Sequence, residues 1–398
     1  MTRGAERPLR VLMVMHLPAH MELGGARVQL ELAQVLRARG CDVQVLDRAE
    51  ILGDRRPGRL GISPAAFAAA AVRRVRAVAR DYDVVDAHQG NLPVSKRRLG
   101  FEGLVVTRSV GLAPLYADFE REARRRWPEA RTGRFVARPI HRWREWQFLH
   151  QVTKTLRLCD LAIVPNEDER EYLGTHLSIG AKTVVRPLGI SPQQLDRMRG
   201  VTPAGADEPP RVAFIGHWTP RKGAHDWPQI ISRVRRAHPE VGFLFLGTGN
   251  TTAEVMPSLE PAADAVQVVA SYKTEELAQL LAGVRVGALP SYIEGLGIGV
   301  LEKLAAGIPS VCYDVPGPRE TVGRVDRRLL VPAGDVEAFA TRLVEVLTLA
   351  DDAYGALSQR CREIAAQFSW RLIGQDTLED YRASLAKLNT SRANAPRP

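Results

Sequence analysis

The amino-acid sequence predicts an α/β protein with two domains, each built around a parallel sheet. Short apolar segments alternate with segments of helical periodicity almost throughout the chain, which is the pattern of repeated strand–helix–strand units. The length of 398 residues exceeds what one hydrophobic core usually serves. The stretch 200–210, GVTPAGADEPP, is rich in proline and glycine and separates two such series, so we expect it to be a linker.

The first domain is expected at residues 1–199. Its helix at GGARVQLELAQVLRARG has apolar residues at helical spacing and ends at Gly40, a residue suited to a helix C-terminus. The next helix begins with Ser63 as N-cap and Pro64 in the first turn. Five segments have the apolar, β-branched character of strands: LRVLMVMH, CDVQVLD, YDVVDAHQ, EGLVVTRSV and LAIVPN.

The second domain is expected at residues 211–365 and repeats this architecture. Its strands are predicted at RVAFIG, VGFLFLG, AVQVVA, VRVGALP, IPSVCYD and RLLVP. A last helix, at 366–390, is expected to pack back on the first domain. Because the two halves share one architecture, a cleft between them is the default site for a ligand.

Positive charge is concentrated in the first half of the chain. Residues 1–199 hold 34 Lys and Arg against 22 Asp and Glu, whereas the remainder has a net charge of −2. This excess indicates an acidic partner, which is an anionic membrane, a charged acceptor or nucleic acid. No apolar run approaches the roughly 20 residues that span a bilayer. We therefore expect a cytoplasmic protein that is soluble or peripheral at the inner face of the membrane.

The four cysteines form no C-x-x-C pair, so free buried thiols are expected and a disulfide framework is not. No group of His, Cys, Asp and Glu has metal-ligand spacing, and we expect neither a metal nor another cofactor. The two aspartates of DYD, at Asp81 and Asp83, precede a buried strand and are interpreted as a solvated turn.

Two glutamates stand eight positions apart in LPSYIEGLGIGVLEKLAAGIPSVCYD, which reads as strand, glycine loop, helix and strand. The loop would leave three amides free at the helix N-terminus, where they favour a phosphate. Glu302, one turn inside the helix, leans back toward Glu294 at the rim. Carboxylates suit hydroxyl-rich groups, because they accept two hydrogen bonds from a diol. Together these features indicate a nucleotide sugar. The three amides are those of Leu296, Gly297 and Ile298.

The block PSYIEGLGIGVLEKLAAGIPSV resembles the motif of the retaining glycosyltransferases of the GT-B fold, family four (glycosyl transferases group 1), in which seven residues separate two glutamates. The resemblance extends over nearly the whole chain, from about Leu9 to Leu388. It implies two Rossmann-like domains facing across a cleft, with the acceptor on the first and the nucleotide sugar on the second. By resemblance, Glu294 contacts the hydroxyls of the donor sugar and Glu302 holds the ribose diol.

Two further segments resemble donor-side segments of the family. IGHWTPRKG puts Lys222 where the family binds the donor diphosphate, which needs more than the about half a charge of a helix N-terminus. The family usually has an arginine where this chain has His217, and we expect Arg221 to compensate. In ELGGARVQ, Gly24 and Gly25 resemble the glycine loop that approaches the donor phosphate or the acceptor.

The acceptor side departs from the family pattern. VVTRSVGL resembles a segment in which the family commonly has a histidine near the transferred sugar, and this chain has Val110 there. His88, at the end of a neighbouring strand, is the nearest other histidine, and we predict that it is catalytic together with Glu294 and Lys222. The acceptor-side candidates are Arg108 and Ser109.

An arginine- and tryptophan-rich segment follows, at 119–150. It holds nine arginines together with Trp127, Trp143 and Trp146. Such a composition suits an anionic membrane surface, while the interspersed glutamates also allow a solvated pair of helices.

The function predicted from these residues is transfer of a hexose-type sugar, with retention, from a nucleotide-diphosphate sugar to a glycan, a lipid carrier or a small metabolite. The pathway would be polysaccharide or glycoconjugate biosynthesis. Two alternatives remain open, namely a non-catalytic relative that binds a nucleotide sugar and a nucleotide-sugar epimerase of the same architecture. Nucleic-acid binding has only the charge asymmetry in its favour and is not expected.

Overall fold

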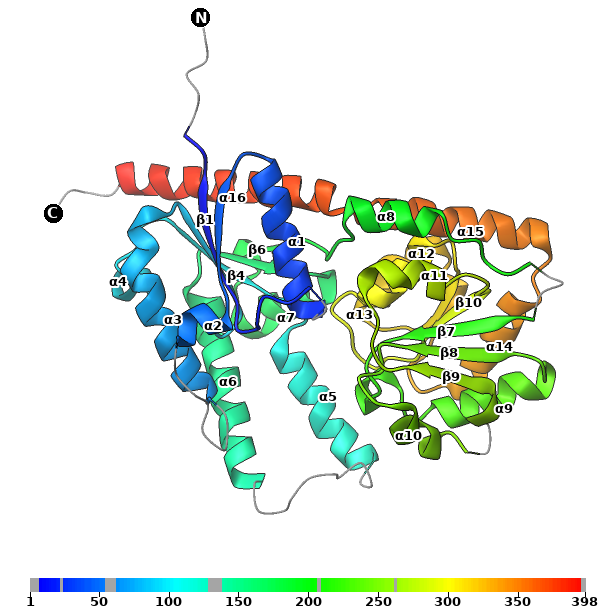
Figure 1. Ribbon diagram of the computed structural model, residues 1–398. Coiled ribbons are helices and arrows are strands. Elements are labelled where there is room, and N and C mark those ends of the chain that lie inside the picture. Colours follow the sequence, from blue (N-terminus) through cyan, green and yellow to red (C-terminus); the bar gives the residue numbers. More distant parts are fainter. Residues whose placement is uncertain are drawn as a thin grey trace, which may run out of the picture. The chain divides into compact units, whose positions relative to one another are not determined.

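The structure is a computed structural model, and it describes residues 7–21, 24–53, 62–127, 138–205, 209–260 and 263–394. The chain divides into two compact units (Figure 1). The first comprises Met1–Pro114, Thr132–Pro187 and Trp370–Pro398, and the second comprises Leu115–Arg131 and Leu188–Ser369. Each unit contains a six-stranded sheet whose neighbouring strands are all parallel. The predicted α/β class with two parallel sheets is confirmed.

The sheet of the first unit has the order β2-β1-β3-β4-β5-β6, so the direction of strand addition reverses between β1 and β3. Open parallel sheets bind ligands beyond the carboxyl ends of the strands at such a reversal. The strands are β1 (Arg10–Val14), β2 (Asp42–Leu46), β3 (Val84–His88), β4 (Leu104–Arg108), β5 (Leu161–Val164) and β6 (Thr183–Val185).

The sheet of the second unit has the order β12-β11-β10-β7-β8-β9, and its direction reverses between β7 and β10. In that pair Phe214 lies opposite Ala288, so both strands end at the same level. The loops that follow β7 and β10 therefore emerge side by side. The strands are β7 (Arg211–Ile215), β8 (Gly242–Leu246), β9 (Val266–Val269), β10 (Val286–Leu289), β11 (Ser310–Tyr313) and β12 (Leu330–Val331).

The helices largely follow the predicted signals. The side chain of Ser63 accepts a hydrogen bond from the amide of Ala66, and Pro64 is the first helical residue, as expected. Up to β7 the helices are α1 (Gly24–Ala38), α2 (Arg48–Leu52), α3 (Pro64–Val78), α4 (Lys96–Leu99), α5 (Ala113–Arg126), α6 (Arg138–Leu158), α7 (Glu167–Leu177) and α8 (Pro192–Arg199). Those that follow are α9 (Trp227–Ala237), α10 (Thr252–Val255), α11 (Leu277–Leu280), α12 (Ile298–Ala305), α13 (Pro316–Val325), α14 (Val336–Leu347), α15 (Asp351–Ala366) and α16 (Trp370–Ala393).

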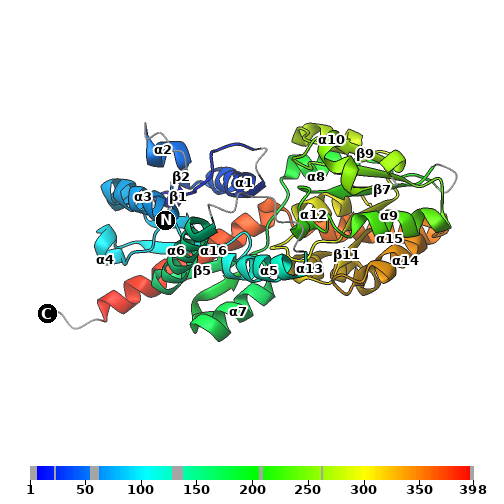
Figure 2. The same ribbon diagram turned by 90° about the horizontal axis from the view of Figure 1, so that it is seen from below.

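In the second unit, α9 and α12 cover opposite faces of the sheet (Figure 2). The indole of Trp227, on α9, packs edge-on against the ring of Phe214. Gly299, on α12, lies so close to Ile215 that a Cβ there would be 2.9 Å from the isoleucine side chain. Successive side chains of a strand point to opposite faces, so these two contacts put the helices on different sides.

The boundary between the units differs from the predicted linker at 200–210. Helix α8 already belongs to the second unit, where it packs on α12. The guanidinium of the buried Arg285 donates to the carbonyl of Ala204 at 2.8 Å, which fixes this stretch to the second unit. Residues 206–208 lie outside the described part of the chain. The proline- and glycine-rich stretch is thus not a flexible linker at Ala204, because the side chain of the buried Arg285 provides a hydrogen-bond donor for the carbonyl of that residue.

Two segments belong to the unit that is formed mainly by the other half of the sequence. From Leu115 onward, α5 groups with the second unit, although the sequence assigned it to the first domain. Helix α16 groups with the first unit, where the indole NH of Trp370 donates to the Glu31 carboxylate on α1 at 2.6 Å. Gly374 allows this close packing, since a Cβ at that position would lie 2.4 Å from Val35.

The described part of the chain contains no helix that is both long enough and apolar enough to cross a membrane. The four cysteines are free and buried, as predicted. Among the described residues no three or more His, Cys, Asp and Glu side chains gather in a way that could hold a metal ion.

We predict that Trp370→Phe lowers the free energy of unfolding by about 2 kcal/mol, because it removes a buried hydrogen bond to a charged group while retaining most of the ring packing. Thermal and urea denaturation measure the change. Leu372→Ala, at an exposed position of the same helix, is the control and should alter stability by less than about 0.5 kcal/mol. Equal effects of the two substitutions would contradict the anchoring role of the indole.

Candidate functional site

The loops after β7 and β10 form one continuous structure at the strand reversal of the second unit. The amide of Tyr292 donates to the carbonyl of Arg221 at 2.9 Å. Gly223 has a φ of 78°, and a Cβ there would lie 2.2 Å from the carbonyl oxygen of Pro290. Only glycine fits this approach. The two predicted donor-side segments, IGHWTPRKG and PSYIEGLG, are therefore joined backbone to backbone.

A buried ion pair occupies this junction. The Lys222 ammonium donates to Oε1 of Glu294, and Nη1 of Arg221 lies 3.6 Å from the same oxygen. Glu294 is only 6% exposed. Burial by itself would raise the pKa of the Glu294 carboxyl, but Lys222 and Arg221 hold it below its ordinary value. Burial also lowers the pKa of Lys222, against the attraction of Glu294. The sequence predicted that these residues share one site, and in the structure they are in contact.

The second glutamate, Glu302, lies on α12, the helix that follows the loop of Glu294. Glu302 is 2% exposed, in the second turn of the helix. The helix begins as predicted, since the carbonyl of Gly297 accepts from the amide of Val300 and Gly297 adopts a φ of 85°. Leu296 is buried, and Ile298 is the first helical residue. The helix N-terminus that follows Gly297 thus lies between two buried glutamates in the sequence, Glu294 in the loop before it and Glu302 in its second turn.

His217 belongs to the same edge but points to a third loop. It is exposed, and Gly249, in the loop after β8, leaves room for its ring, since a Cβ there would lie 2.6 Å from Nδ1 of His217. The amide of Trp218 donates to the carbonyl of Thr248 at 2.7 Å, which ties the two loops together. The glycine segment LGTGN, Leu246–Asn250, therefore takes part in packing between the two loops.

In the first unit, His88 lies at the end of β3, beside a histidine that the sequence analysis missed. The rings of His88 and His16, the latter just after β1, have centroids 4.6 Å apart. Burial, together with His16, lowers the pKa of His88 to about 3. Burial and Arg48 lower the pKa of His16. Two imidazoles with lowered pKa values thus lie at the strand reversal of this unit, and the position of His16 at the end of the predicted first strand was the available signal.

The glycines predicted to form a loop in this unit are part of a helix. Gly24 and Gly25 form the first turn of α1. A Cβ on Gly25 would lie 3.0 Å from the side chain of Leu17, so this glycine allows the helix to approach the preceding loop. Residues 22 and 23 lie outside the described part of the chain.

Arg108, predicted on the acceptor side, is part of a buried network instead. Its Nε and Nη2 donate to Oδ2 of Asp86 at 3.0 and 2.7 Å, and Nη2 also donates to the Tyr381 hydroxyl. The Tyr381 hydroxyl donates to the same carboxylate oxygen. Arg108 is 3% exposed. Its charge is therefore used to hold α16 on β3 and β4, and the geometry gives no support to a role at an acceptor.

Ser109 is also held internally, by a glutamate that the sequence analysis did not single out. Its hydroxyl donates to Glu169 Oε2 at 2.9 Å, and the amide of Leu112 donates to Oε1 at 3.0 Å. Burial raises the pKa of Glu169 to about 7, although these groups and Asn166 donate to it. Glu169 thereby fixes the loop that contains Val110. In the structure Asn166 caps α7, and its side chain accepts a hydrogen bond from the amide of Glu169.

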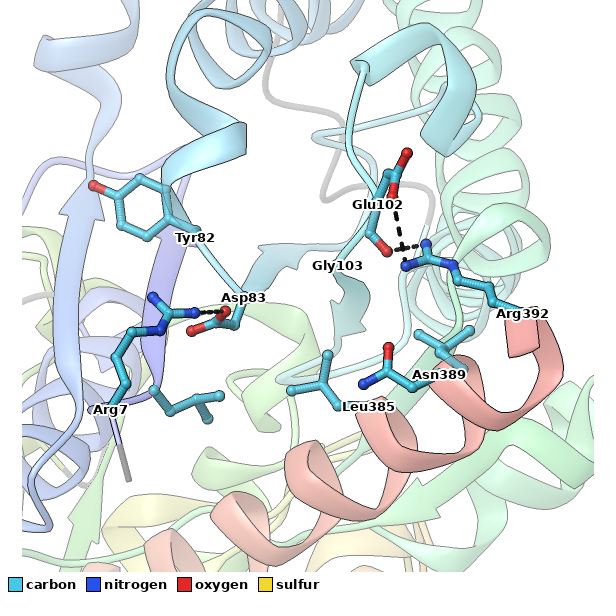
Figure 3. A pocket seen from close by; sticks show the side chains of 10 residues that line it. Arg7, Tyr82, Asp83, Glu102, Gly103, Leu385, Asn389 and Arg392 are labelled. Carbon is cyan, nitrogen blue, oxygen red and sulfur yellow. Dashed lines mark hydrogen bonds and ion pairs between the residues drawn. The ribbon is translucent and has the colours of Figure 1, made fainter. Parts of the chain in front are cut away.

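A separate hollow lies at the opposite edge of the first sheet, where β1, β3 and β4 begin (Figure 3). Asp83 pairs there with Arg7 and accepts from the amide of Arg10 at 2.8 Å, so the DYD segment serves a local turn. Arg392 pairs with Glu102. The hollow is lined by Arg7, Leu9, Tyr82, Asp83, Glu102, Gly103, Leu385, Leu388, Asn389 and Arg392. Its charges are paired, and it lies away from the carboxyl edge where parallel sheets bind ligands.

Comparison with known families identifies the second unit. Residues 209–349 match the model of the glycosyl transferases group 1. The chain carries a group 1 glycosyltransferase domain. Lys222, Glu294 and Glu302 all lie within this domain, and the resemblance predicted from the glutamate motif is confirmed.

Curated relatives match part of the chain. It is 32% identical to alpha-maltose-1-phosphate synthase of Mycolicibacterium smegmatis over 194 residues, which are 44% of this chain and 48% of that protein. It is 28% identical to D-inositol 3-phosphate glycosyltransferase of Mycobacterium marinum over 246 residues, 58% of this chain and 52% of that one. The chain thus spans about half the length of these relatives.

Solved structures match almost the whole chain. Sucrose-phosphate synthase from Thermosynechococcus elongatus has a TM-score of 0.73 at 20% identity and covers 95% of this chain and 100% of its own. The glycosyltransferase WaaG has a TM-score of 0.66 at 16% identity, covering 92% and 98%. At such identities the likeness shows the fold. The fold that carries the group 1 domain is that of the GT-B glycosyltransferases, as predicted.

We predict that Glu169→Gln removes a pH dependence of stability. A carboxyl whose pKa is higher in the folded than in the unfolded state stabilises fully below about pH 4.5, and this contribution is lost as the pH rises through 7. The loss is up to about 3 kcal/mol, at 1.36 kcal/mol per pKa unit. Thermal denaturation between pH 5 and 8 should show the variant gaining on the wild type as the pH rises. A constant difference between the two proteins would refute the raised pKa.

Proposed function

We propose that the chain is a retaining glycosyltransferase that moves a hexose-type sugar from a nucleotide-diphosphate sugar to an acceptor. The observation that carries the proposal is the buried Lys222–Glu294 pair, at the strand reversal of the group 1 domain and beside the N-terminus of α12. One cation and one carboxylate at that point match the two parts of the donor, its diphosphate and its sugar hydroxyls.

Donor binding would exchange partners within this pair. The diphosphate draws the ammonium of Lys222 and the guanidinium of Arg221, and Glu294 then accepts hydrogen bonds from the sugar hydroxyls. Glu302 holds the ribose diol. As the glycosidic bond breaks, negative charge grows on the leaving diphosphate, where Lys222 and the amides of Gly297 and Ile298 stabilise it. The leaving diphosphate takes the acceptor proton on the same face of the sugar, which preserves the anomeric configuration.

The names of relatives support a nucleotide-sugar donor. HepE from Anabaena, which has a TM-score of 0.62 and 16% identity to this chain, was solved with UDP and glucose. Acceptors differ among the relatives, one of which is a GDP-mannose-dependent phosphatidylinositol monomannoside mannosyltransferase of Corynebacterium glutamicum at 26% identity. For this chain a glycan, a lipid-linked sugar or a small metabolite fits, within polysaccharide or glycoconjugate biosynthesis.

An anionic membrane is the proposed docking partner of α6. Trp143 and Trp146 are 55% and 61% exposed, and Ile140 is also exposed. These residues recur every three residues and so share one side of the helix. Exposed cations accompany them at Arg142, Lys154 and Arg157. Aromatic side chains flanked by cations suit the headgroup region of a bilayer. The expected location is the cytoplasmic face of the membrane, while residues 128–137 of the basic segment lie outside the described part.

We predict that Glu294→Gln and Lys222→Met each reduce turnover of the accepted nucleotide sugar by a hundredfold or more, because each removes a group that interacts with charge in the transition state. Transfer and hydrolysis are measured with a panel of UDP-, GDP- and dTDP-sugars, with and without EDTA. Glu260→Gln, at an exposed position of the same unit, is the control.

Other outcomes of this panel decide the alternatives. Undiminished transfer by both variants would refute the site. Donor binding without transfer or hydrolysis would favour a non-catalytic relative. Val110, at a position where the family commonly has a histidine, supports that alternative. Conversion of the free donor into an isomer would favour an epimerase.

We predict that replacing both Trp143 and Trp146 by alanine weakens binding to vesicles of phosphatidylglycerol by at least tenfold, since the two exposed indoles would together lose more than about 1.4 kcal/mol of apolar burial at roughly 25 cal/mol per Å². Co-sedimentation measures the binding, and phosphatidylcholine vesicles should bind the wild type less. Leu372→Ala removes an exposed apolar side chain elsewhere and serves as the control. Equal binding of wild type and double variant would exclude this face of α6 as the contact.

A further inference from the structure

A lysine with no solvent exposure lies inside the second unit, directly beneath the proposed donor site. Lys303, on α12, is 0% exposed. Its Nζ donates to the carbonyl of Ala288 on β10 at 3.0 Å and to that of Ala213 on β7 at 3.3 Å. These are the two strands between which the sheet order reverses. Lysine is almost never fully buried, because removing an ammonium from water is costly.

The sheet is built around this side chain. A Cβ on Gly287, in β10, would lie 2.8 and 2.9 Å from Cδ and Cε of Lys303 and 2.2 Å from Oγ of Ser310. Any residue other than glycine at position 287 would therefore displace the lysine stem. Glycine inside a strand is unfavourable unless something approaches closely. Here the approaching group is the side chain of Lys303, so a lysine at position 303 requires a glycine at position 287.

The amine lies close to the mouth of the site. Its two carbonyl partners are two residues and one residue before the ends of β7 and β10, at Ile215 and Leu289. The loops that begin there carry Lys222 and Glu294.

The charged and titratable groups that act on the amine come from every element around it. They are Cys312 on β11, Lys222 in the loop after β7, Glu302 on α12 itself and Glu294 in the loop after β10. Burial has the largest effect and lowers the pKa of Lys303 to about 8. The amine is thus close to the point at which a nearby change of charge alters its protonation.

A purely structural role does not account for the amine. An apolar side chain of the same length, such as methionine, would fill the passage beside Gly287 without burying an ammonium, and such replacements are often neutral or stabilising. What the apolar side chain would lack is positive charge under the N-terminus of α12, where the proposed function puts two phosphates.

We propose that Lys303 is a positioning residue that supplies positive charge to the donor diphosphate from its buried place between α12 and the sheet, and that diphosphate binding draws one proton onto its amine. The inference rests on the proposed function. The proton comes from the buffer, converts the neutral amine to an ammonium, and returns to the buffer when the nucleotide leaves. The attraction is Coulombic and acts through the low dielectric of the protein interior, so no direct contact is needed.

The test is isothermal titration calorimetry of the full chain with UDP and with GDP at pH 8.5, in two buffers of different ionisation enthalpy. Wild type should take up a proton on binding, since about half or more of the Lys303 amine is neutral at that pH. Lys303→Met should abolish the uptake and weaken nucleotide binding by about tenfold, which corresponds to a shift of one pKa unit. Lys387→Met, at an exposed position of α16, should bind like the wild type.

The outcomes separate this inference from the proposed function. Nucleotide binding without proton uptake by the wild type would overturn the role of Lys303 and leave the donor site standing, and this result needs no variant. Uptake that persists in Lys303→Met would assign the proton to Lys222 and equally overturn it. Failure of both nucleotides to bind the wild type would overturn the donor site, and the inference with it.

Discussion

The second unit depends on one buried ion pair. An ammonium or a carboxylate alone would be costly at this depth, so Lys222 and Glu294 are stable there only together. Their contact requires the loops after β7 and β10 to meet, and the glycine at position 223 makes that approach possible. The strand order provides the adjacency, because β7 and β10 are neighbours although residues 216–285 lie between them in the sequence. The pair thus joins the two loops, and the proposed function uses it to bind the donor.

Buried charge has a different use in the first unit. Arg108, Asp86 and Tyr381 satisfy one another across β3, β4 and α16, and nothing in their arrangement is directed at a substrate. The same chemistry, a buried cation beside a carboxylate, therefore serves structure in one sheet and a candidate site in the other. What distinguishes the two is position. The ion pair of the second unit lies in loops beyond the strand ends, whereas Asp86 lies within its strand.

Aromatic contacts bring α5 to the donor-side loops within the second unit. The ring of Tyr292 stacks with Phe119 and meets Trp127 edge-on, with centroids 6.0 and 5.1 Å apart. The guanidinium of Arg221 lies 5.3 Å from the centre of the Tyr116 ring. Helix α5 thus supports the residues on either side of the ion pair. The arginines of α5 and Trp127, the residue after the helix, suggested an exposed surface in the sequence. Trp127 packs instead against His225 and Tyr292, which come from loops about 100 residues or more away.

The sequence by itself determined the described strands except β6, the starts of α3 and α12, the family of the second domain and the positions of Lys222, Glu294 and Glu302, because these follow from local periodicity and from a motif of fixed spacing. Tertiary structure alone decided which charges are exposed and which are paired. The local sequence does not show that Lys303 or Glu169 is buried. In the structure Lys303 is enclosed between α12 and two strands, and Glu169 holds a loop about 60 residues away. Burial and pairing depend on contacts between residues far apart in the chain, and no local pattern encodes them.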